Sequence, residues 1–290
     1  MLRRPLSLAV VAAAGVALSA CAPQGADSSS SASSSASGKT DCSPEKLETL
    51  KPNTLTIATD QPAYEPWMVD DSPENGKGFE SAVAYAVAEQ LGFDKQQVTW
   101  TRVPFNAAIQ PGPRPFDFDI NQFSITDERK QAVDFSSPYY TVSQAVITTK
   151  GSKAEGATSI ADLKDLKIGA QVTTTSLEVL TKVIAPKSDP AVFNTNDDAK
   201  LALQNGQVDA IVVDLPTAFY ITAAELDNGV IVGQLADSGE GGDQFGLLLE
   251  KDGPLTGCVS KAVDALREDG TLADLEKQWL SDVADAPVLN

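Results

Sequence analysis

Strand-like and helix-like segments alternate along residues 55–140, and the same alternation returns over residues 159–232. In the first unit, residues 55–60 have the pattern of a buried strand, residues 79–91 that of an amphipathic helix, and residues 98–103 that of the next strand. This order predicts an α/β fold with largely parallel sheets. A chain of 290 residues is long enough for one large domain or for two.

Two longer strand patterns, residues 141–150 and 244–249, flank the second unit. They could form a pair of crossings between two lobes, with the second unit inserted into the first. The two predicted C-terminal helices then return to the first lobe. The sequence therefore predicts lobe 1 from residues 46–143 and 245–290, and lobe 2 from residues 144–244.

The first 21 residues have the pattern of an export signal. Arg3 and Arg4 precede an apolar segment, residues 6–20, that is too short for a typical membrane span. The segment ends in the letters LSAC, which resemble the lipobox of bacterial lipoproteins, where the cysteine (here Cys21) becomes the lipidated first residue. The alternative is a plain signal peptide cut near the same place. Residues 22–45 are Ser-rich and are predicted to form a disordered tether.

The composition argues against several kinds of partner and site. The formal net charge is −18, which argues against nucleic acid and against electrostatic binding to anionic lipid. The chain has no histidine, so it lacks the usual general base and the commonest transition-metal ligand. Its three cysteines show neither a CxxC motif nor a zinc spacing. We therefore expect no metal and no cofactor.

Two cysteines, Cys42 and Cys258, remain once Cys21 is assigned to a lipid. In an exported protein two leftover cysteines suggest a disulfide, because the compartment is oxidising. Such a bridge would join the start of the fold to its C-terminal part. The alternative is a pair of buried free thiols.

The residues from 116 to 131 combine an alternating strand pattern, a polar turn and the start of a short helix. Thr126 is a good N-cap, and acidic residues follow it in the first turn. Arg129 lies one turn in, where its guanidinium can hold a carboxylate through two parallel hydrogen bonds. The pattern predicts an anion site, although a capped helix with a surface arginine would have the same sequence.

The order and spacing of the motifs resemble a known family, the family-3 solute-binding proteins, which are polar amino-acid receptors of bacterial ABC importers. The similarity runs through residues 50–281. The matching segments are residues 55–60, 64–67, 78–80, 119–129, 133–140, 160–164, 168–169, 205–210 with Asp214, 244–246, 269–272 and 279–280.

This resemblance implies a type II periplasmic-binding-protein-like fold, in which two α/β lobes are joined by two crossover strands. The ligand would bind in the cleft between the lobes. Binding would close the cleft, and the closed receptor would deliver its ligand to a membrane permease. The resemblance also implies a monomer without a cofactor.

The resemblance assigns a clamp for the main-chain groups of an amino acid. Arg129 matches the arginine that holds the α-carboxylate, and Ser124 matches a strand-end partner of the same group. Thr174 matches a threonine that contacts the carboxylate from lobe 2. Asp214 matches the acid that takes the α-ammonium; alternatively, it is only the N-cap of the helix that contains Pro216.

Four further residues are assigned to the ligand side chain or to its surroundings. Tyr64 and Phe105 match an aromatic pair that encloses the side chain, with ordinary core packing as the alternative. Asp60 matches an acid near the far end of the ligand in some members. Gln122 stands where small residues are usual, so we expect it to reach into the pocket. Val172 replaces the usual glycine before the Thr-Thr turn.

The sequence thus predicts a lipoprotein on the outer face of the cytoplasmic membrane that binds a polar L-amino acid for an ABC permease and catalyses no reaction. One alternative is a dehydratase-like enzyme on the same fold, which without histidine would use a cleft carboxylate such as Asp60, Glu65 or Asp214. Another is a ligand-sensing receptor that acts through a membrane partner.

Overall fold

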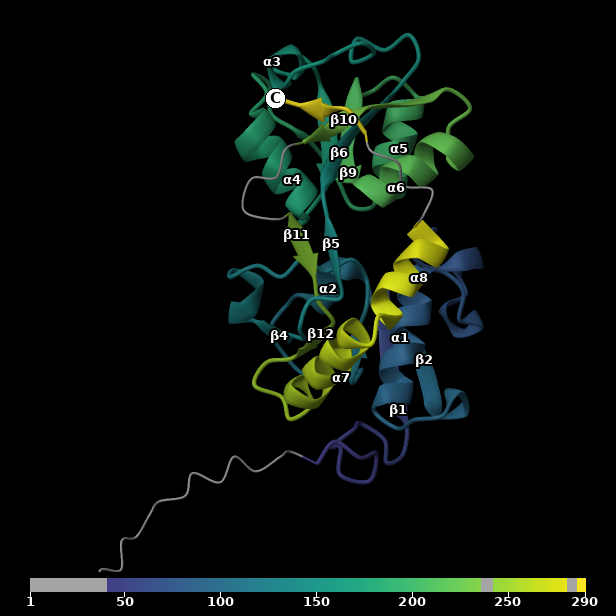
Figure 1. The fold of residues 1–290 in the computed structure, drawn as a ribbon. Helices are drawn as coiled ribbons and strands as arrows, with labels where there is room; N and C mark the ends of the chain where they lie inside the picture. Colours follow the sequence, from purple (N-terminus) through teal and green to yellow (C-terminus); the bar gives the residue numbers. More distant parts are fainter. Residues whose placement is uncertain (1–40, 236–241, 281–285) are drawn as a thin grey trace, which may run out of the picture. The chain divides into compact units, whose positions relative to one another are not determined.

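The computed structural model describes residues 41–235, 242–280 and 286–290. The predicted export signal, Cys21 and most of the predicted tether lie outside the described residues. The described chain forms a five-stranded sheet, a six-stranded sheet and a two-stranded ribbon, with helices packed on the two larger sheets (Figure 1). This mixed α/β architecture confirms the predicted fold class.

Lobe 1 is built on the five-stranded sheet, in the order β2-β1-β3-β12-β4. Strand β1 pairs in parallel with β2 and β3, whereas β12 runs antiparallel to β3 and β4. The strands are β1 (Leu55–Thr59), β2 (Val98–Arg102), β3 (Phe118–Asp119), β4 (Val133–Phe135) and β12 (Leu248–Glu250). Short 3-10 helices lie in the connections: η1 (Val69–Asp71), η2 (Pro73–Asn75), η3 (Lys95–Gln97) and η4 (Arg129–Gln131).

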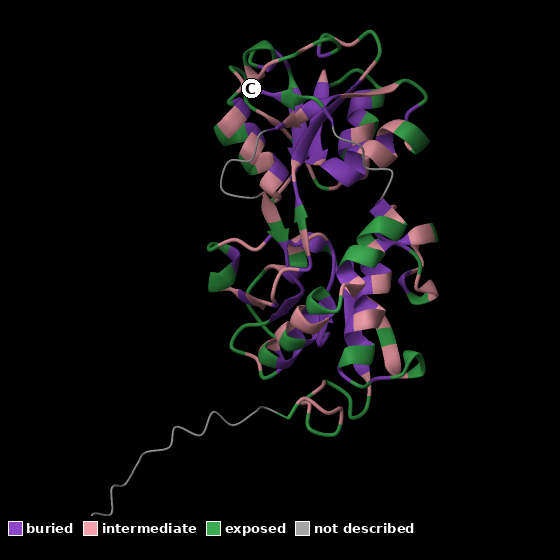
Figure 2. Ribbon diagram, viewed as in Figure 1, coloured by how far each residue is buried: buried purple, intermediate pink, exposed green. Residues whose placement is uncertain are grey.

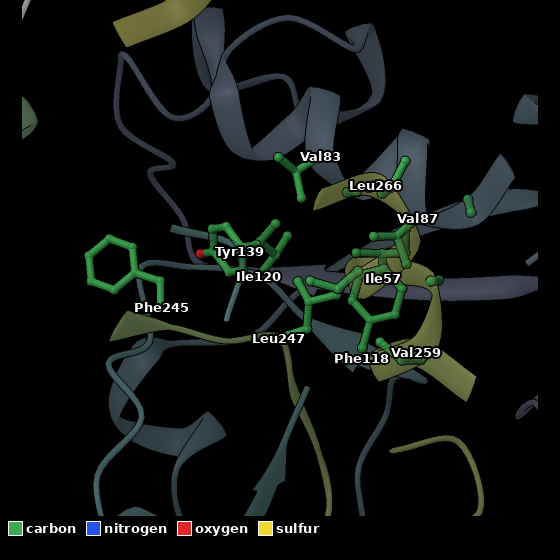
Figure 3. Packing of buried hydrophobic residues seen from close by; sticks show 14 of the residues in the cluster. Ile57, Val83, Val87, Phe118, Ile120, Tyr139, Phe245, Leu247, Val259 and Leu266 are labelled. Atoms are coloured by element: carbon green, nitrogen blue, oxygen red, sulfur yellow. The ribbon is translucent and has the colours of Figure 1, made fainter. Parts of the chain in front are cut away.

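Helices cover both faces of this sheet. On one face α7 and α8 lie beside α1 (Figure 1), and apolar side chains of α1 and α7 pack on sheet residues such as Ile57 and Phe118 (Figure 3). On the other face, Phe105 at the start of α2 joins Ala58 and Phe123 in a second cluster. Full burial of one valine, leucine, isoleucine or phenylalanine side chain stabilises the fold by about 1.5–3 kcal/mol. The helices are α1 (Phe79–Gln90), α2 (Phe105–Ala108), α7 (Thr256–Glu268) and α8 (Thr271–Leu280).

Lobe 2 is built on the six-stranded sheet, in the order β13-β10-β6-β9-β7-β8, with an apolar cluster on each face. Figure 2 shows that its strands are mainly buried. The strands are β6 (Gln144–Thr149), β7 (Ile168–Gln171), β8 (Ala191–Phe193), β9 (Ala210–Asp214), β10 (Gly229–Leu235) and β13 (Val288–Leu289). The helices are α3 (Ile160–Leu163), α4 (Thr175–Val179), η5 (Leu180–Ile184), α5 (Asn196–Gln204), α6 (Leu215–Tyr220) and η6 (Ile221–Glu225).

Each of the two predicted long strands is interrupted where the chain passes between the lobes. Strand β5 (Tyr140–Val142) is followed by β6, and β11 (Asp243–Phe245) is followed by β12. Strands β5 and β11 pair with each other in an antiparallel ribbon that belongs to neither large sheet. Ser143 separates β5 from β6, and residues 246–247 separate β11 from β12.

The end of the chain differs from the prediction. The sequence predicts residues 245–290 in lobe 1. In the structure, however, β13 pairs in parallel with β10 and so forms the outermost strand of the lobe 2 sheet. The prediction is therefore wrong for the last residues. The two-residue strand is too short to show a pattern in the sequence, and the pairing covers a sheet edge that would otherwise be open.

Cys42 and Cys258 are joined by a disulfide across 216 positions of the chain. Cys258 is buried in α7, and Cys42 lies in the segment that precedes the first strand. The bridge therefore joins the entrance of lobe 1 to its C-terminal helices, as the sequence suggested. Among the described residues, no helix combines the length and the apolar character needed to cross a membrane.

Candidate functional site

All eight residues predicted to contact a ligand line one cavity. Lobe 1 supplies most of them, and lobe 2 supplies Thr174 and Asp214. With the part open to solvent included, the space between the lining residues is about 600 Å³. The eight residues are Asp60, Tyr64, Phe105, Gln122, Ser124, Arg129, Thr174 and Asp214.

Arg129 is the buried cation of this cavity, with only 8% of its surface exposed. The strand and the helix beside Arg129 are shorter than the sequence predicts. The predicted strand is reduced to the two residues of β3, and the predicted helix to the single 3-10 turn η4. The prediction of Thr126 as the N-cap is wrong, since Glu128 holds that position and the first turn contains no acidic residue. The Thr126 side chain still contacts the turn, because its Oγ1 accepts a hydrogen bond from the Arg129 main-chain N–H at 3.1 Å. The burial argues against an ordinary surface arginine.

The Arg129 guanidinium contacts both lobes. Its Nη1 donates to the Ser124 carbonyl at 2.7 Å, and its Nη2 donates to the Thr173 carbonyl at 2.9 Å. Its Cζ also lies 5.4 Å from the centre of the Phe105 ring. Burial lowers the pKa of Arg129, while Asp243 and Asp214 raise it. A guanidinium has five N–H donors, so donors beyond these two can serve an anionic ligand.

Asp214 is the lobe 2 acid of the cavity. It ends β9 and holds the N-cap position of α6, but its side chain makes no capping hydrogen bond. Its Oδ1 instead accepts from the Gln144 side-chain amide at 2.7 Å. The pKa of Asp214 is raised to about 7: burial is the largest cause and neighbouring Asp243 adds to it, while the Gln144 hydrogen bond and Arg129 oppose the rise. This geometry does not fit the alternative of a capping residue alone.

The threonine turn before α4 brings lobe 2 to lobe 1. Thr174 caps α4, since its Oγ1 accepts from Leu177 N at 3.2 Å and donates to the Gln171 carbonyl at 2.7 Å. Thr175, which the sequence did not single out, places its Oγ1 3.1 Å from Ser124 Oγ. Thr173 was also missed: it has a left-handed φ of 60°, and its side chain bonds Asn106 Oδ1 at 2.5 Å.

Gln122 lines the cavity, but Glu80 holds its side chain. The Glu80 carboxylate accepts from Gln122 N at 2.7 Å, from Gln122 Nε2 and from the Tyr139 hydroxyl. These contacts stabilise the left-handed φ of 48° at Gln122. Burial raises the pKa of Glu80 to about 7. Glu80 was not predicted as a site residue, although it lies in the matching segment 78–80, because an acid in the first turn of a predicted helix does not by itself indicate this role.

Glu80 is buried because of the turn that precedes it. Gly78 has a φ of 95°, and a Cβ there would lie 2.4 Å from the Trp67 carbonyl oxygen. Only glycine fits this close approach. The first N–H groups of α1 then donate to carbonyls of the same loop, with Phe79 N bonded to Pro66 O and Glu80 N to Trp67 O.

Asp60 directly follows β1 and lines the cavity together with Tyr64 and Phe105. Its carboxylate accepts from Gln61 N at 2.6 Å and from Phe105 N at 3.1 Å. Burial raises its pKa above the usual value. Arg102 is nearby, but its guanidinium bonds the Asp60 main-chain oxygen and pairs with the Asp71 carboxylate at 2.7 Å.

Tyr64 and Phe105, the two aromatic residues expected to enclose a ligand side chain, also pack within the protein. Phe105 stacks on Phe123, with ring centres 4.8 Å apart and planes 15° apart, and also lines the cavity. Tyr64 lines the cavity as well, and burial raises its pKa. Both residues therefore take part in packing while they present a face to the cavity.

Comparisons with known proteins agree with this architecture. The family model described as "Bacterial extracellular solute-binding proteins, family 3" matches residues 55–282. An L-arginine-binding protein of Pseudomonas aeruginosa is 28% identical over 239 residues, covering 78% of this chain and 90% of its own length. The lysine/arginine/ornithine-binding periplasmic protein of Escherichia coli is 27% identical, covering 79% of this chain and 88% of its own.

Solved structures give the same result. An ancestral arginine-binding protein bound to glutamine has a TM-score of 0.65 and 30% identity, covering 80% of this chain and all of its own. An ancestral amino acid-binding protein, described as a precursor of cyclohexadienyl dehydratase, has a TM-score of 0.64 and 30% identity, covering 78% of this chain and 95% of its own. The chain therefore belongs to the family-3 bacterial extracellular solute-binding proteins.

Proposed function

We propose that this chain binds a basic L-amino acid between its lobes and delivers it to an ABC permease. The α-carboxylate of the ligand would contact Arg129, and its α-ammonium would contact Asp214. A zwitterion needs a fixed cation and a fixed anion a few ångströms apart, each of them desolvated and hydrogen-bonded. Ligand contact to both lobes would favour the closed form.

The charge balance of the cavity wall carries the proposal of a basic side chain. The ionisable acids and bases that line the cavity, among the described residues, are Arg129, Asp214 and Asp60, apart from the phenol of Tyr64. A zwitterion uses the first two and leaves Asp60 as a lining acid without a lining cation of its own, since nearby Arg102 is paired with Asp71. A guanidinium or ammonium at the far end of the ligand would neutralise it. The arginine- and lysine-binding names of the relatives support the same class.

Arginine and citrulline separate this proposal from a neutral ligand, because citrulline replaces the guanidinium by an uncharged ureido group. We expect calorimetry to show arginine bound at least about tenfold more tightly, since only arginine places a positive charge beside the Asp60 carboxylate and a factor of ten is about 1.4 kcal/mol. Asp60→Asn should remove most of this preference and leave citrulline affinity nearly unchanged. Asp264→Asn, on the exposed side of α7, is the matched control.

Equal affinity for arginine and citrulline in the unmodified protein would contradict the basic side chain and point to a neutral ligand such as glutamine. Recovery of the ligand after long incubation tests the enzymatic alternative. We expect mass spectrometry to return the amino acid unchanged, and a stoichiometric product would contradict a pure binding role.

We also propose that Cys21 anchors the protein to the membrane through a lipid and that the folded part acts as a monomer beside its permease. The support is the order of segments in the sequence: two arginines, an apolar segment, the letters LSAC that end at Cys21, and then the Ser-rich residues. Cys21→Ser should shift the protein from the detergent phase to the aqueous phase in phase partitioning of expressing cells. Ser30→Ala, which keeps both the lipobox and the disulfide, should remain in the detergent phase. Equal partitioning of the Cys21 variant and the unmodified protein would contradict the anchor.

A further inference from the structure

Gln144 is a buried polar residue that lies behind Asp214 and is not part of the cavity wall. It begins β6, directly after the β5 crossing. Its Nε2 donates to Asp214 Oδ1 at 2.7 Å and to Asp243 Oδ2 at 3.3 Å. Its Oε1 accepts from Ser176 Oγ at 2.6 Å. One amide thus connects the end of β9, the crossing strand β11 and the start of α4.

The two acids fix which end of the amide faces them. Ionised carboxylates only accept hydrogen bonds, so the amide nitrogen must face them, and the amide oxygen then accepts from the Ser176 hydroxyl. The nitrogen has two hydrogens, which is one for each acid. Such an amide satisfies both carboxylates and separates two like charges that would otherwise repel each other.

We propose that Gln144 is a positioning residue for the ligand ammonium, because its amide holds the Asp214 carboxylate in place and keeps it apart from Asp243. This inference rests on the proposed function, in which Asp214 takes the α-ammonium. Gln144 does not touch the ligand and acts through Asp214.

The pKa of Asp214 makes this role measurable, because it sets how the affinity for the ligand depends on pH. Its pKa is about 7, raised by burial and by Asp243 and lowered by Gln144. An ammonium pairs with the ionised carboxylate, so affinity should fall as pH falls below the pKa of the ligand-free protein. The other ionisable groups that act on Asp214, or on which it acts, are Arg129 from η4, Glu80 from α1, and Tyr139 and Tyr140 at the start of the β5 crossing.

The test is the affinity for arginine between pH 5 and 8, measured by calorimetry on the unmodified protein and on two variants. Gln144→Met removes a hydrogen bond to the ionised form, so the midpoint of the affinity loss should move up by about one pH unit and affinity at pH 7 should fall several-fold. Asp243→Asn removes a like charge, so its midpoint should move down. Ser176→Ala should move the midpoint up, by less than Gln144→Met does.

Gln234→Met is the matched control, because Gln234 lies on β10 and its amide bonds the Ala286 carbonyl, away from Asp214. Its midpoint should not move. Equal loss of affinity at all pH values in Gln144→Met, or midpoints that move in the same direction in the Gln144 and Asp243 variants, would overturn the inference. If Gln144→Met does not fold, the opposite shifts of Ser176→Ala and Asp243→Asn decide the question.

The outcomes also separate this inference from the proposed function. If the unmodified protein binds no amino acid, the proposed function fails, and the inference fails with it. If the unmodified protein binds arginine but the midpoints do not move, only the role of Gln144 is wrong.

Discussion

Arg129→Ala should lower the affinity for an amino acid by at least about thirtyfold, because removal of one partner from a buried charged hydrogen-bonded pair costs about 2–5 kcal/mol. The alanine would leave the ligand carboxylate desolvated without its cation. Isothermal titration calorimetry with arginine measures the loss directly. Arg129→Lys should restore part of the affinity, because a lysine supplies the charge without the two parallel donors of a guanidinium.

Arg267→Ala is the matched control for this experiment. Arg267 lies on α7, where it is exposed and pairs with Asp264, so its removal should leave arginine binding within about twofold. Near-normal affinity in Arg129→Ala would show that the carboxylate binds elsewhere. Circular dichroism should establish that the variant is folded, since Arg129 also bonds main-chain carbonyls of both lobes.

Loss of the Cys42–Cys258 disulfide should cause the largest change in stability. The bridge closes a loop of 216 positions, and chain-entropy arguments give about 5 kcal/mol for a loop of that size. For a protein of this length that corresponds to a fall in Tm of about 10 °C or more. We expect calorimetric melting of a Cys42→Ala/Cys258→Ala variant to show this loss.

Reductant provides the control for the disulfide. It should lower the Tm of the unmodified protein toward that of the double variant and should leave the double variant unchanged. Mass spectrometry after alkylation without reductant should find both cysteines unmodified. Alkylation of both residues in the native protein would contradict the bridge.

The fold class was predictable because the strand and helix patterns lie in short stretches of the sequence and recur along it. Alternation of strands and helices identified the α/β class, and the two apolar stretches at residues 141–150 and 244–249 located the crossings. Their interruption was not predictable, since it depends on how a strand pairs with two different partners. The two-residue β13 was also missed, because its position is set by pairing with β10 and not by its own sequence.

The residues that line the cavity were predictable from motif spacing, but the buried residues that hydrogen-bond to them were not. Arg129 and Asp214 stand within recognisable motifs. Glu80 contacts Gln122 across 42 positions, and Gln144 contacts Asp214 across 70. Buried polar partners of this kind are selected by tertiary neighbours, and no local period or cap marks them.

The pairing of β13 with β10 has a mechanical consequence for a two-lobed receptor. Leu280, the last residue of α8, packs in the lobe 1 core, and Ala286, just before β13, packs in a lobe 2 core. The two residues are six positions apart in the chain, and six residue steps of fully extended chain span at most about 22 Å. Covalent connection alone therefore limits the distance between these two points of the lobes to this length, whatever the angle between the lobes.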